Sequence, residues 1–397
     1  MVIRHIPFSN NARLFSVSLD IAMNTLRRPS LWLLTLLIMF PQLVETIYSP
    51  ALPGIATSFH VSSERADQTL SVYFVAFAVG VAMWGWLSDC IGRRWAMLAG
   101  LICYGTGCAL AVVATDFSVL LLARMISAVG AAAGSVVVQT MLRDSYESPA
   151  LSRVFSVMGA ALALSPVFGL LSGGWLVSLY GHTGVFVALV LLALLLLILT
   201  ATMLPETRPE HTLSPRLIAL LSRMRRDSDL WKNIMLVALL NTMLFSYYSL
   251  APFLFGQLGW SSRAFGWTGL LLAFASLSGS LLNRRLLTTG LTPERLVRYA
   301  CVLAALSGLV AWWLQHCAWI LLPVFGVVLA YGIAIPNVLS QALRHYREQV
   351  GAAGALFGLS YYLLLGMMLG LAGMVQQLGL VLSVCALLAW LCSLGRR

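Results

Sequence analysis

The stretch LWLLTLLIMFPQLVETIYSPALP, residues 31–53, decides the fold class of this chain. About 20 apolar residues span the hydrocarbon core of a bilayer, and this stretch is long and apolar enough to do so. Glu45 lies well inside it, where a carboxylic acid costs about 3 kcal/mol on insertion scales. Because embedded acids mark functional sites, we predict that Glu45 carries a proton. The alternative is a glutamate that only hydrogen-bonds a neighbouring helix.

Composition extends this prediction to the whole chain. Of its 397 residues, 60% are hydrophobic and 10% are charged, whereas soluble domains carry about 25% charged residues. Twelve runs are long and apolar enough to cross a bilayer, and none alternates like a membrane β-barrel. They cover residues 31–56, 68–87, 95–114, 118–141, 152–179, 184–204, 231–256, 265–287, 295–315, 318–341, 352–376 and 379–395. We therefore expect an all-α integral membrane protein with 12 transmembrane helices.

The basic residues orient these spans. The formal net charge is +11, and all but three of the 25 Lys and Arg fall on one side of the predicted membrane. Arg65 and Arg263 fall on the other side, and Arg124 is embedded. The positive-inside rule then places both termini in the cytoplasm, as in a bacterial-type inner membrane. Orientation explains the basic excess, so we infer no nucleic-acid partner from it.

A charged segment divides the runs into two sets of six. We predict a cytoplasmic lead-in (1–30), an N-terminal six-helix bundle (31–204), a cytoplasmic linker (205–230) and a C-terminal six-helix bundle (231–397). GSLLNRRL (279–286) falls in the second set where GWLSDCIGRR (85–94) falls in the first, with Asn283 in the position of Asp89. Parallel repeats of this kind are expected of two related, pseudo-symmetric halves.

The sequence contains no motif that is typical of an enzyme active site. No Walker loop GxxxxGK[ST] occurs, and the six histidines lie in loops or at helix ends. The seven cysteines are scattered without a CxxC pair, which predicts packing rather than metal ligation. The first 30 residues lack the continuous apolar core of a signal peptide. We therefore expect no enzymatic activity, no metal site and no cofactor.

Helical spacing brings candidate cavity residues onto shared faces, because residues three and four apart lie on one side of a helix. The candidates for a substrate cavity are Gln42 and Tyr48 beside Glu45, Tyr73 and Phe77 on the second run, Asn241, Phe245 and Tyr248 on the seventh, Asn337 on the tenth and Tyr361 on the eleventh. Aromatic stripes equally serve packing, and buried amides equally pair between helices. Both interpretations remain open from the sequence.

Arg124 is the embedded cation, on a small and mildly polar face of the fourth run. A permanently charged guanidinium at that depth needs a carboxylate, or several carbonyls and waters. If Arg124 and Glu45 face the same space, the two form a proton-coupling pair. The alternative is an arginine that ties helix backbones together.

The segment GWLSDCIGRR (85–94) predicts a tight cytoplasmic turn. Glycines permit close approach and unusual dihedrals, the acid at a helix C-terminus needs a cationic partner, and the arginines face the anionic leaflet. The candidate conformational gate here consists of Gly85, Asp89, Gly92, Arg93 and Arg94. The pattern resembles the signature loop of the major facilitator superfamily, with Cys90 where that family usually has a basic residue. The resemblance implies a fold of two six-helix bundles.

Further motifs resemble the twelve-helix drug:proton antiporters, in the bicyclomycin-resistance (Bcr/CflA) and EmrD-like branch. TIYSPALP (46–53) resembles the opening motif of that branch, and in similar proteins the arginine of RMISAVG (124–130) is associated with proton coupling. SPVFGLLSGGWL (165–176) resembles an antiporter element. Its gate candidates are Pro166, Gly169 and Gly173, and the glycine pair lets helix backbones touch. Many members have an aspartate at the position of Thr46, one residue after Glu45.

Together these features favour a proton-coupled secondary transporter that exports a small hydrophobic or amphipathic compound by alternating access. The direction of transport follows from the resemblance. Its expected partners are a small-molecule substrate, protons and the lipid bilayer, and we expect a monomer. Two alternatives remain open: a dedicated exporter of one metabolite such as a siderophore, and a non-transporting membrane sensor on a transporter fold.

Overall fold

The computed structural model describes residues 29–146, 150–208, 217–346 and 350–395. The predicted lead-in (1–30) lies almost wholly outside these residues. The described residues are built from helices and contain no strand, which confirms the all-α fold class. Most of the helices are longer than 20 residues, as a chain of membrane spans requires.

The helices follow the chain in this order: α2 (Leu31–Tyr48), the short 3-10 helix η1 (Ser49–Ala51), α3 (Leu52–Ser58), α4 (Ser63–Ile91), α5 (Arg93–Val112), α6 (Phe117–Ser145), α7 (Ala150–Met203), α8 (Leu217–Arg226), α9 (Ser228–Gln257), α10 (Ser262–Thr288), α11 (Pro293–Leu314), η2 (Ala318–Ile320), α12 (Leu321–Ala342), α13 (Val350–Val375) and α14 (Leu378–Leu394). Pro50 lies in η1, where the first span changes from α2 to α3, whereas Pro41 lies inside α2.

Among the described residues, 10 helices are long and apolar enough to cross a membrane. One of them belongs to α7, which breaks at Gly181, where φ is 64° and ψ is −164°. Glycine suits this position because it adopts positive φ without a steric penalty. Dividing α7 at Gly181 and adding the shorter apolar helix α14 accounts for the twelve predicted spans.

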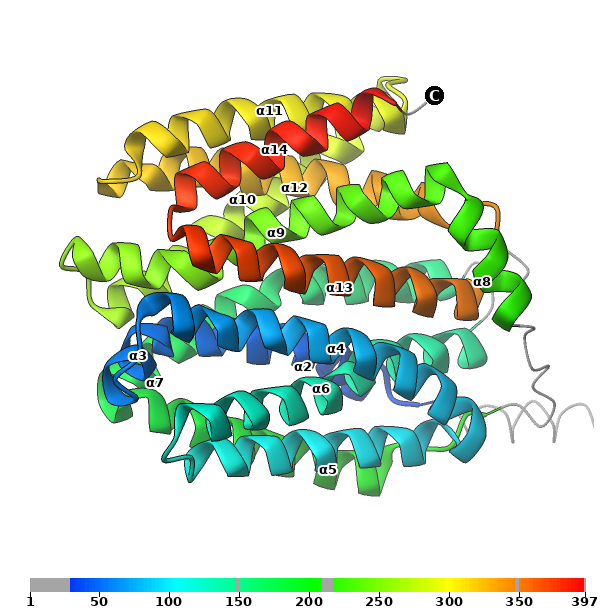
Figure 1. Ribbon diagram of the computed structural model, residues 1–397. Coiled ribbons are helices and arrows are strands. Elements are labelled where there is room, and N and C mark those ends of the chain that lie inside the picture. Colours follow the sequence, from blue (N-terminus) through cyan, green and yellow to red (C-terminus); the bar gives the residue numbers. More distant parts are fainter. Residues whose placement is uncertain (1–28, 147–149, 209–216, 347–349, 396–397) are drawn as a thin grey trace, which may run out of the picture.

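Figure 1 shows the helices in two groups, with α2–α7 in the first and α9–α14 in the second. Helix α8 lies at the end of the molecule where the C-terminus is found, and we call this the linker end. The far end is the opposite one, where α3 lies. The groups meet where α4 packs on α13 and α7 packs on α10. The exact boundaries of the two bundles (31–204 and 231–397) and of the linker (205–230) remain predictions from the sequence.

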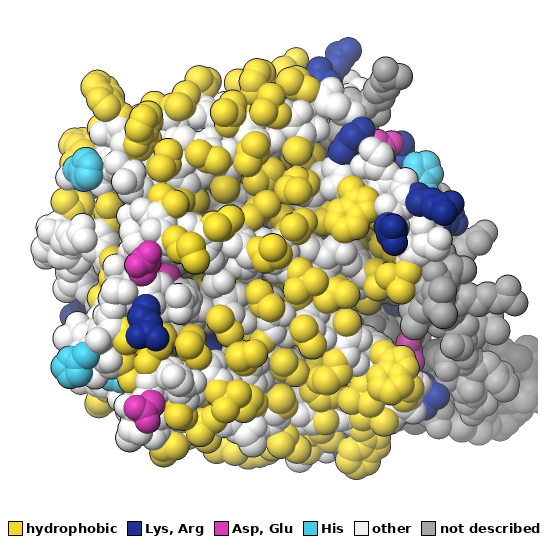
Figure 2. Space-filling view, in the orientation of Figure 1, with side chains coloured by type: hydrophobic (Ala, Val, Ile, Leu, Met, Phe, Trp, Pro, Cys, Tyr) yellow, Lys and Arg dark blue, Asp and Glu magenta, His cyan; other side chains and the backbone are white. Residues whose placement is uncertain are grey.

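Hydrophobic side chains cover the middle of the face seen in Figure 2. Lys and Arg side chains gather towards the linker end of this face. Large apolar residues such as Trp86, Trp95 and Trp313 are exposed in the chain. Water-soluble monomers rarely expose so extensive an apolar surface. The hydrophobic middle of this face therefore lies against lipid.

Candidate functional site

Close packing between two helices sets the position of Glu45. Gly169 and Gly173 of α7 lie against α2, where a Cβ at either glycine would overlap Thr46 or Ile47. Backbone contact of this kind is what the small residues at four-residue spacing predict. The contact lies directly beside Glu45 in the chain, so α7 fixes the height and rotation of the acid on α2.

Thr46 faces α7 and is fully buried. Its hydroxyl donates to the carbonyl oxygens of Gln42 at 2.9 Å and Leu43 at 3.1 Å. Gln42 is half-buried one turn earlier on α2. An acid at position 46 would meet the backbone of α7. The shift by one residue to Glu45 turns the acid about 100° away from that contact.

Arg124 of α6 lies between two aromatic rings from other helices. Its guanidinium carbon is 4.0 Å from the centroid of the Tyr48 ring of α2 and 4.3 Å from that of the Tyr73 ring of α4. A desolvated cation–π contact contributes about 2 kcal/mol. The side chain is 2% exposed, and its Nε and Nη2 atoms have no hydrogen-bond partner in the described part of the chain. Two rings thus hold the cation that we expected to need a carboxylate or carbonyls.

The two tyrosines beside Arg124 differ in their hydroxyl groups. The hydroxyl of Tyr48 donates to Thr69 Oγ1 at 2.8 Å, inside the first group. The hydroxyl of Tyr73 is buried, and no residue within the described ranges bonds to it. Tyr48 is therefore tied to the packing of α2 on α4, whereas Tyr73 offers an unused polar atom beside the cation.

Glu45 lies where the two groups of helices meet. Its side chain is 4% exposed, so it does not face lipid. It interacts electrostatically with Arg124, although no carboxylate of the described residues forms an ion pair with Arg124. Tyrosines on four other helices also interact electrostatically with Glu45, namely Tyr73, Tyr248, Tyr331, Tyr361 and Tyr362. Three of these helices, α9, α12 and α13, belong to the second group.

Aromatic side chains of α4, α9 and α13 pack across the same contact. We call Phe74, Phe77, Phe245, Tyr361 and Tyr362 the aromatic cluster. The ring centroids of Phe74 and Phe245 are 4.5 Å apart, and those of Phe77 and Tyr362 are 4.7 Å apart. Tyr361 and Tyr362 follow at 4.1 Å. Aromatic pairs at such separations contribute about 0.5–1.5 kcal/mol beyond area burial. The cluster combines three predicted cavity residues with Phe74 and Tyr362, which the sequence analysis did not single out.

The two asparagines predicted for the cavity have different partners. Tyr331 of α12 donates to Asn241 Oδ1 at 3.1 Å, which joins Asn241 to a tyrosine that interacts with Glu45. Asn337 donates to Asn283 Oδ1 of α10 at 2.6 Å and to the carbonyl oxygen of Ile333 at 2.8 Å. Asn337 therefore links α12 to α10 within the second group, which is the alternative that the sequence left open for it.

The predicted turn at the linker end is held by a carboxylate from the end of the first group. Gly92 has a φ of 100°, which favours glycine. Glu206 accepts hydrogen bonds from the backbone N–H groups of Arg93 at 2.8 Å and Arg94 at 3.1 Å, at the start of α5. A carboxylate suits a helix N-terminus because the dipole there is positive. Glu206 falls at the start of the predicted linker (205–230), and the sequence did not indicate this role.

Arg93 supplies the cationic partner that Asp89 was expected to need. Its Nη1 atom lies 2.7 Å from Asp89 and its Nε atom lies 2.9 Å from Asp144 of α6. Arg94 instead donates to the carbonyl oxygen of Ala201 at 2.6 Å. The turn thus ties α4, α5, α6 and the end of α7 together at the linker end.

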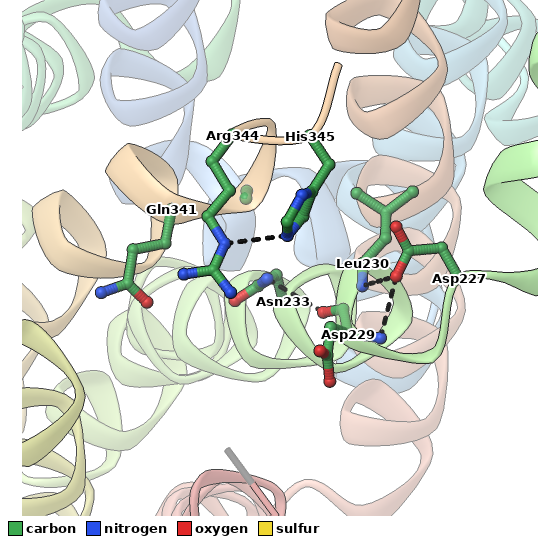
Figure 3. A pocket seen from close by; sticks show the side chains of 8 residues that line it. Asp227, Asp229, Leu230, Asn233, Gln341, Arg344 and His345 are labelled. Atoms are coloured by element: carbon green, nitrogen blue, oxygen red, sulfur yellow. Dashed lines mark hydrogen bonds between the residues drawn. The ribbon is translucent and has the colours of Figure 1, made fainter. Parts of the chain in front are cut away.

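Figure 3 shows a polar hollow between the start of α9 and the end of α12. It is lined by Asp227, Asp229, Leu230, Asn233, Gln341, Ala342, Arg344 and His345. Asp227 Oδ1 accepts from the backbone N–H groups of Asp229 and Leu230, so this carboxylate caps α9. Tyr346 donates to Asp227 Oδ2 at 2.9 Å, and burial with this bond raises the pKa of Tyr346 to about 12. Within the described ranges, no group of three or more His, Cys, Asp or Glu could hold a metal ion.

The sequence profile of the Major Facilitator Superfamily matches residues 31–384. The chain belongs to this superfamily. It is 26% identical over 379 residues to Multidrug resistance protein D of Escherichia coli (strain K12), covering 91% of this chain and 94% of that protein. It is 30% identical over 350 residues to an uncharacterized transporter of Rickettsia bellii (strain RML369-C), covering 84% of this chain and 87% of that protein.

A Bicyclomycin resistance protein homolog of Haemophilus influenzae (strain ATCC 51907 / DSM 11121 / KW20 / Rd) is 27% identical over 360 residues, covering 85% of this chain and 87% of that protein. The names of these relatives agree with the predicted resemblance to the drug:proton antiporter branch. Among solved structures, a D-xylose–proton symporter has the same fold, with a TM-score of 0.72 at 16% identity over 91% of this chain and 96% of that one. As a member of this superfamily, the chain is a multi-pass membrane transporter of a small molecule and not an enzyme.

Proposed function

We propose that this transporter exports a small hydrophobic or amphipathic compound in exchange for protons, and that Glu45 carries the proton. The observation that supports the proposal is the place of Glu45, buried at the contact between the two groups and electrostatically coupled to Arg124. A carboxyl there can exchange a proton for substrate as the groups rock against each other. We propose that the linker end faces the cytoplasm, because the basic residues gather towards it.

The membrane potential can drive this exchange through one carboxyl. Moving one elementary charge through the membrane is worth about 2.3 kcal/mol per 100 mV. In the proposed cycle, substrate enters from the linker end, binds beside the aromatic cluster and displaces the proton of Glu45. Protonation from the far end removes the charge and releases the substrate. Arg124, held between its two rings, stabilises the ionised form from a fixed position.

The surroundings of Glu45 favour an amphipathic substrate. Aromatic faces attract both apolar groups and cations, and the carboxylate adds a negative charge. The relatives named for multidrug and bicyclomycin resistance support a drug-like compound. No contact in the described residues favours a siderophore in particular, so we propose the broader class.

A susceptibility and efflux screen tests the proposal. A deletion strain is complemented with the wild type, with Glu45→Gln or with Glu64→Gln, a matched control at an exposed glutamate of α4. Compounds exported by the wild type should accumulate in Glu45→Gln cells and be exported normally by Glu64→Gln cells. Iron-limited growth is included, because a defect confined to that condition would indicate a siderophore exporter. Unimpaired proton-driven efflux by Glu45→Gln would end the proposal.

A further inference from the structure

A second buried carboxylate joins the two groups at the far end. Asp67, in the second turn of α4, is 2% exposed. Its Oδ1 atom accepts a hydrogen bond from the Ser249 hydroxyl of α9 at 2.9 Å, and its Oδ2 atom accepts one from Gln376 Nε2 at the end of α13. Both donors belong to the second group of helices, so both of these hydrogen bonds cross the contact between the groups.

The backbone around Gln376 fixes the direction of this contact. Gln376 has a φ of 53°, a conformation that few residues other than glycine adopt. Its Nε2 atom also donates to the carbonyl oxygen of Gly373 at 2.7 Å, which prevents the amide from turning its oxygen towards Asp67. A Cβ on Gly373 would lie 3.1 Å from the Cβ of Asp67, so α13 approaches α4 closely at this point.

Among the residues that the structure describes, no cation forms an ion pair with Asp67. On α4 itself, Glu64 and Arg65 are exposed, and the Arg65 guanidinium lies over the Phe117 ring of α6. From α2, the Tyr48 phenol interacts electrostatically with Asp67. The neighbouring helices α9 and α13 present the neutral donors described above.

Two titratable groups of α5 interact with Arg124. On α5, Tyr104 and Cys108 interact with Arg124, and on α6 Arg124 itself lies against the Tyr48 ring. Helix α3 carries no titratable side chain, and His60 follows it in an exposed turn. The charge of Asp67 is therefore held by the two neutral donors of the second group.

We propose that Asp67 is a second proton-linked residue, a latch that holds the far end closed while ionised and weakens when protonated. An ionised carboxylate accepts both bonds as charge-assisted hydrogen bonds, which are roughly twice as strong as neutral ones. Protonation removes this assistance, and the fixed amide of Gln376 cannot become an acceptor. The latch deepens the proposed function, because it assumes that the two groups separate at the far end during exchange.

A neutral bond in the same contact provides the comparison. The Ser71 hydroxyl of α4 donates to the carbonyl oxygen of Gly366 of α13 at 2.8 Å. This bond also crosses between the groups, and neither partner titrates. Removing it should loosen the far end without changing the response to pH.

The latch is tested by measuring a distance across the far end as pH changes. Spin labels are attached at His60→Cys and Gln257→Cys, two exposed positions at the far ends of the two groups, in a Cys90→Ser background because Cys90 is the exposed cysteine. In lipid, the open population of the otherwise unaltered chain should rise as pH falls. With Asp67→Asn it should be independent of pH and about ten-fold larger at neutral pH.

Three further variants separate the possible outcomes. Ser71→Ala should open the far end by a few-fold and keep the pH dependence. Gln376→Leu should open it at neutral pH with Asp67 intact, which provides a test even where Asp67→Asn does not fold. Glu45→Gln should keep the pH-dependent distance while its efflux reports on the proposed function. A wild-type pH response in Asp67→Asn, or a response lost only with Glu45→Gln, would overturn the latch and leave the proton role of Glu45 standing.

Discussion

Replacing Gly173 with alanine tests whether the contact between α7 and α2 positions the site. The new Cβ would overlap the carbonyl oxygen of Ile47 and lie 3.0 Å from its carbonyl carbon and 3.1 Å from its Cα. Backbone atoms cannot rotate away, so α2 must shift near Glu45. Overpacking of this kind costs about 1–3 kcal/mol, and the higher helix propensity of alanine offsets about 1 kcal/mol. We expect a net destabilisation of up to about 2 kcal/mol.

The matched control lies on the same helix. A Cβ on Gly159 of α7 would meet no atom within 4 Å, so Gly159→Ala should be neutral or stabilising. Thermal unfolding in detergent and efflux in cells measure the two effects. Gly173→Ala should lower the apparent Tm and reduce efflux, because it moves Glu45 relative to the second group. Equal Tm and efflux for the two variants would refute the inference that this contact sets the site.

Two further predictions concern charged residues of the first group. Arg124→Lys keeps the charge but removes the planar guanidinium from the rings of Tyr48 and Tyr73. Efflux should fall, and thermal unfolding should show a loss of up to about 2 kcal/mol in stability. Wild-type values in both assays would show that the stacking contributes nothing. Glu206→Ala removes the acceptor for two backbone N–H groups at the start of α5. We expect the free energy of unfolding to fall by about 1–2 kcal/mol, which lowers the apparent Tm. The apparent Tm of this variant should also depend less on added salt. An unchanged Tm would mean that water replaces the cap.

The sequence predicted the membrane fold well because hydrophobic length is a property of each span alone. The break in α7 falls at Gly181, between the predicted spans 152–179 and 184–204. The ends were less well predicted. Helix α4 runs from Ser63 to Ile91, whereas the apolar run covers only 68–87. Asp67 therefore fell just outside the predicted span and was not considered as an embedded acid.

Partners on other helices could not be derived from spacing, because spacing defines only the faces of one helix. The sequence showed that Arg124 needs compensation, but not that the rings of Tyr48 and Tyr73 supply it. It also left both roles open for Asn337, and the structure pairs this amide with Asn283. Which faces oppose each other is a tertiary property, and it decides these roles.

The central claim is that Glu45 exchanges its proton for substrate. The most direct measurement is proton release when a compound exported by wild-type cells is added to purified transporter in weakly buffered detergent solution with a pH indicator. The account predicts release from the wild type and from Glu64→Gln, and none from Glu45→Gln. Equal proton release from Glu45→Gln would contradict the account, because the exchanged proton would then belong to another group.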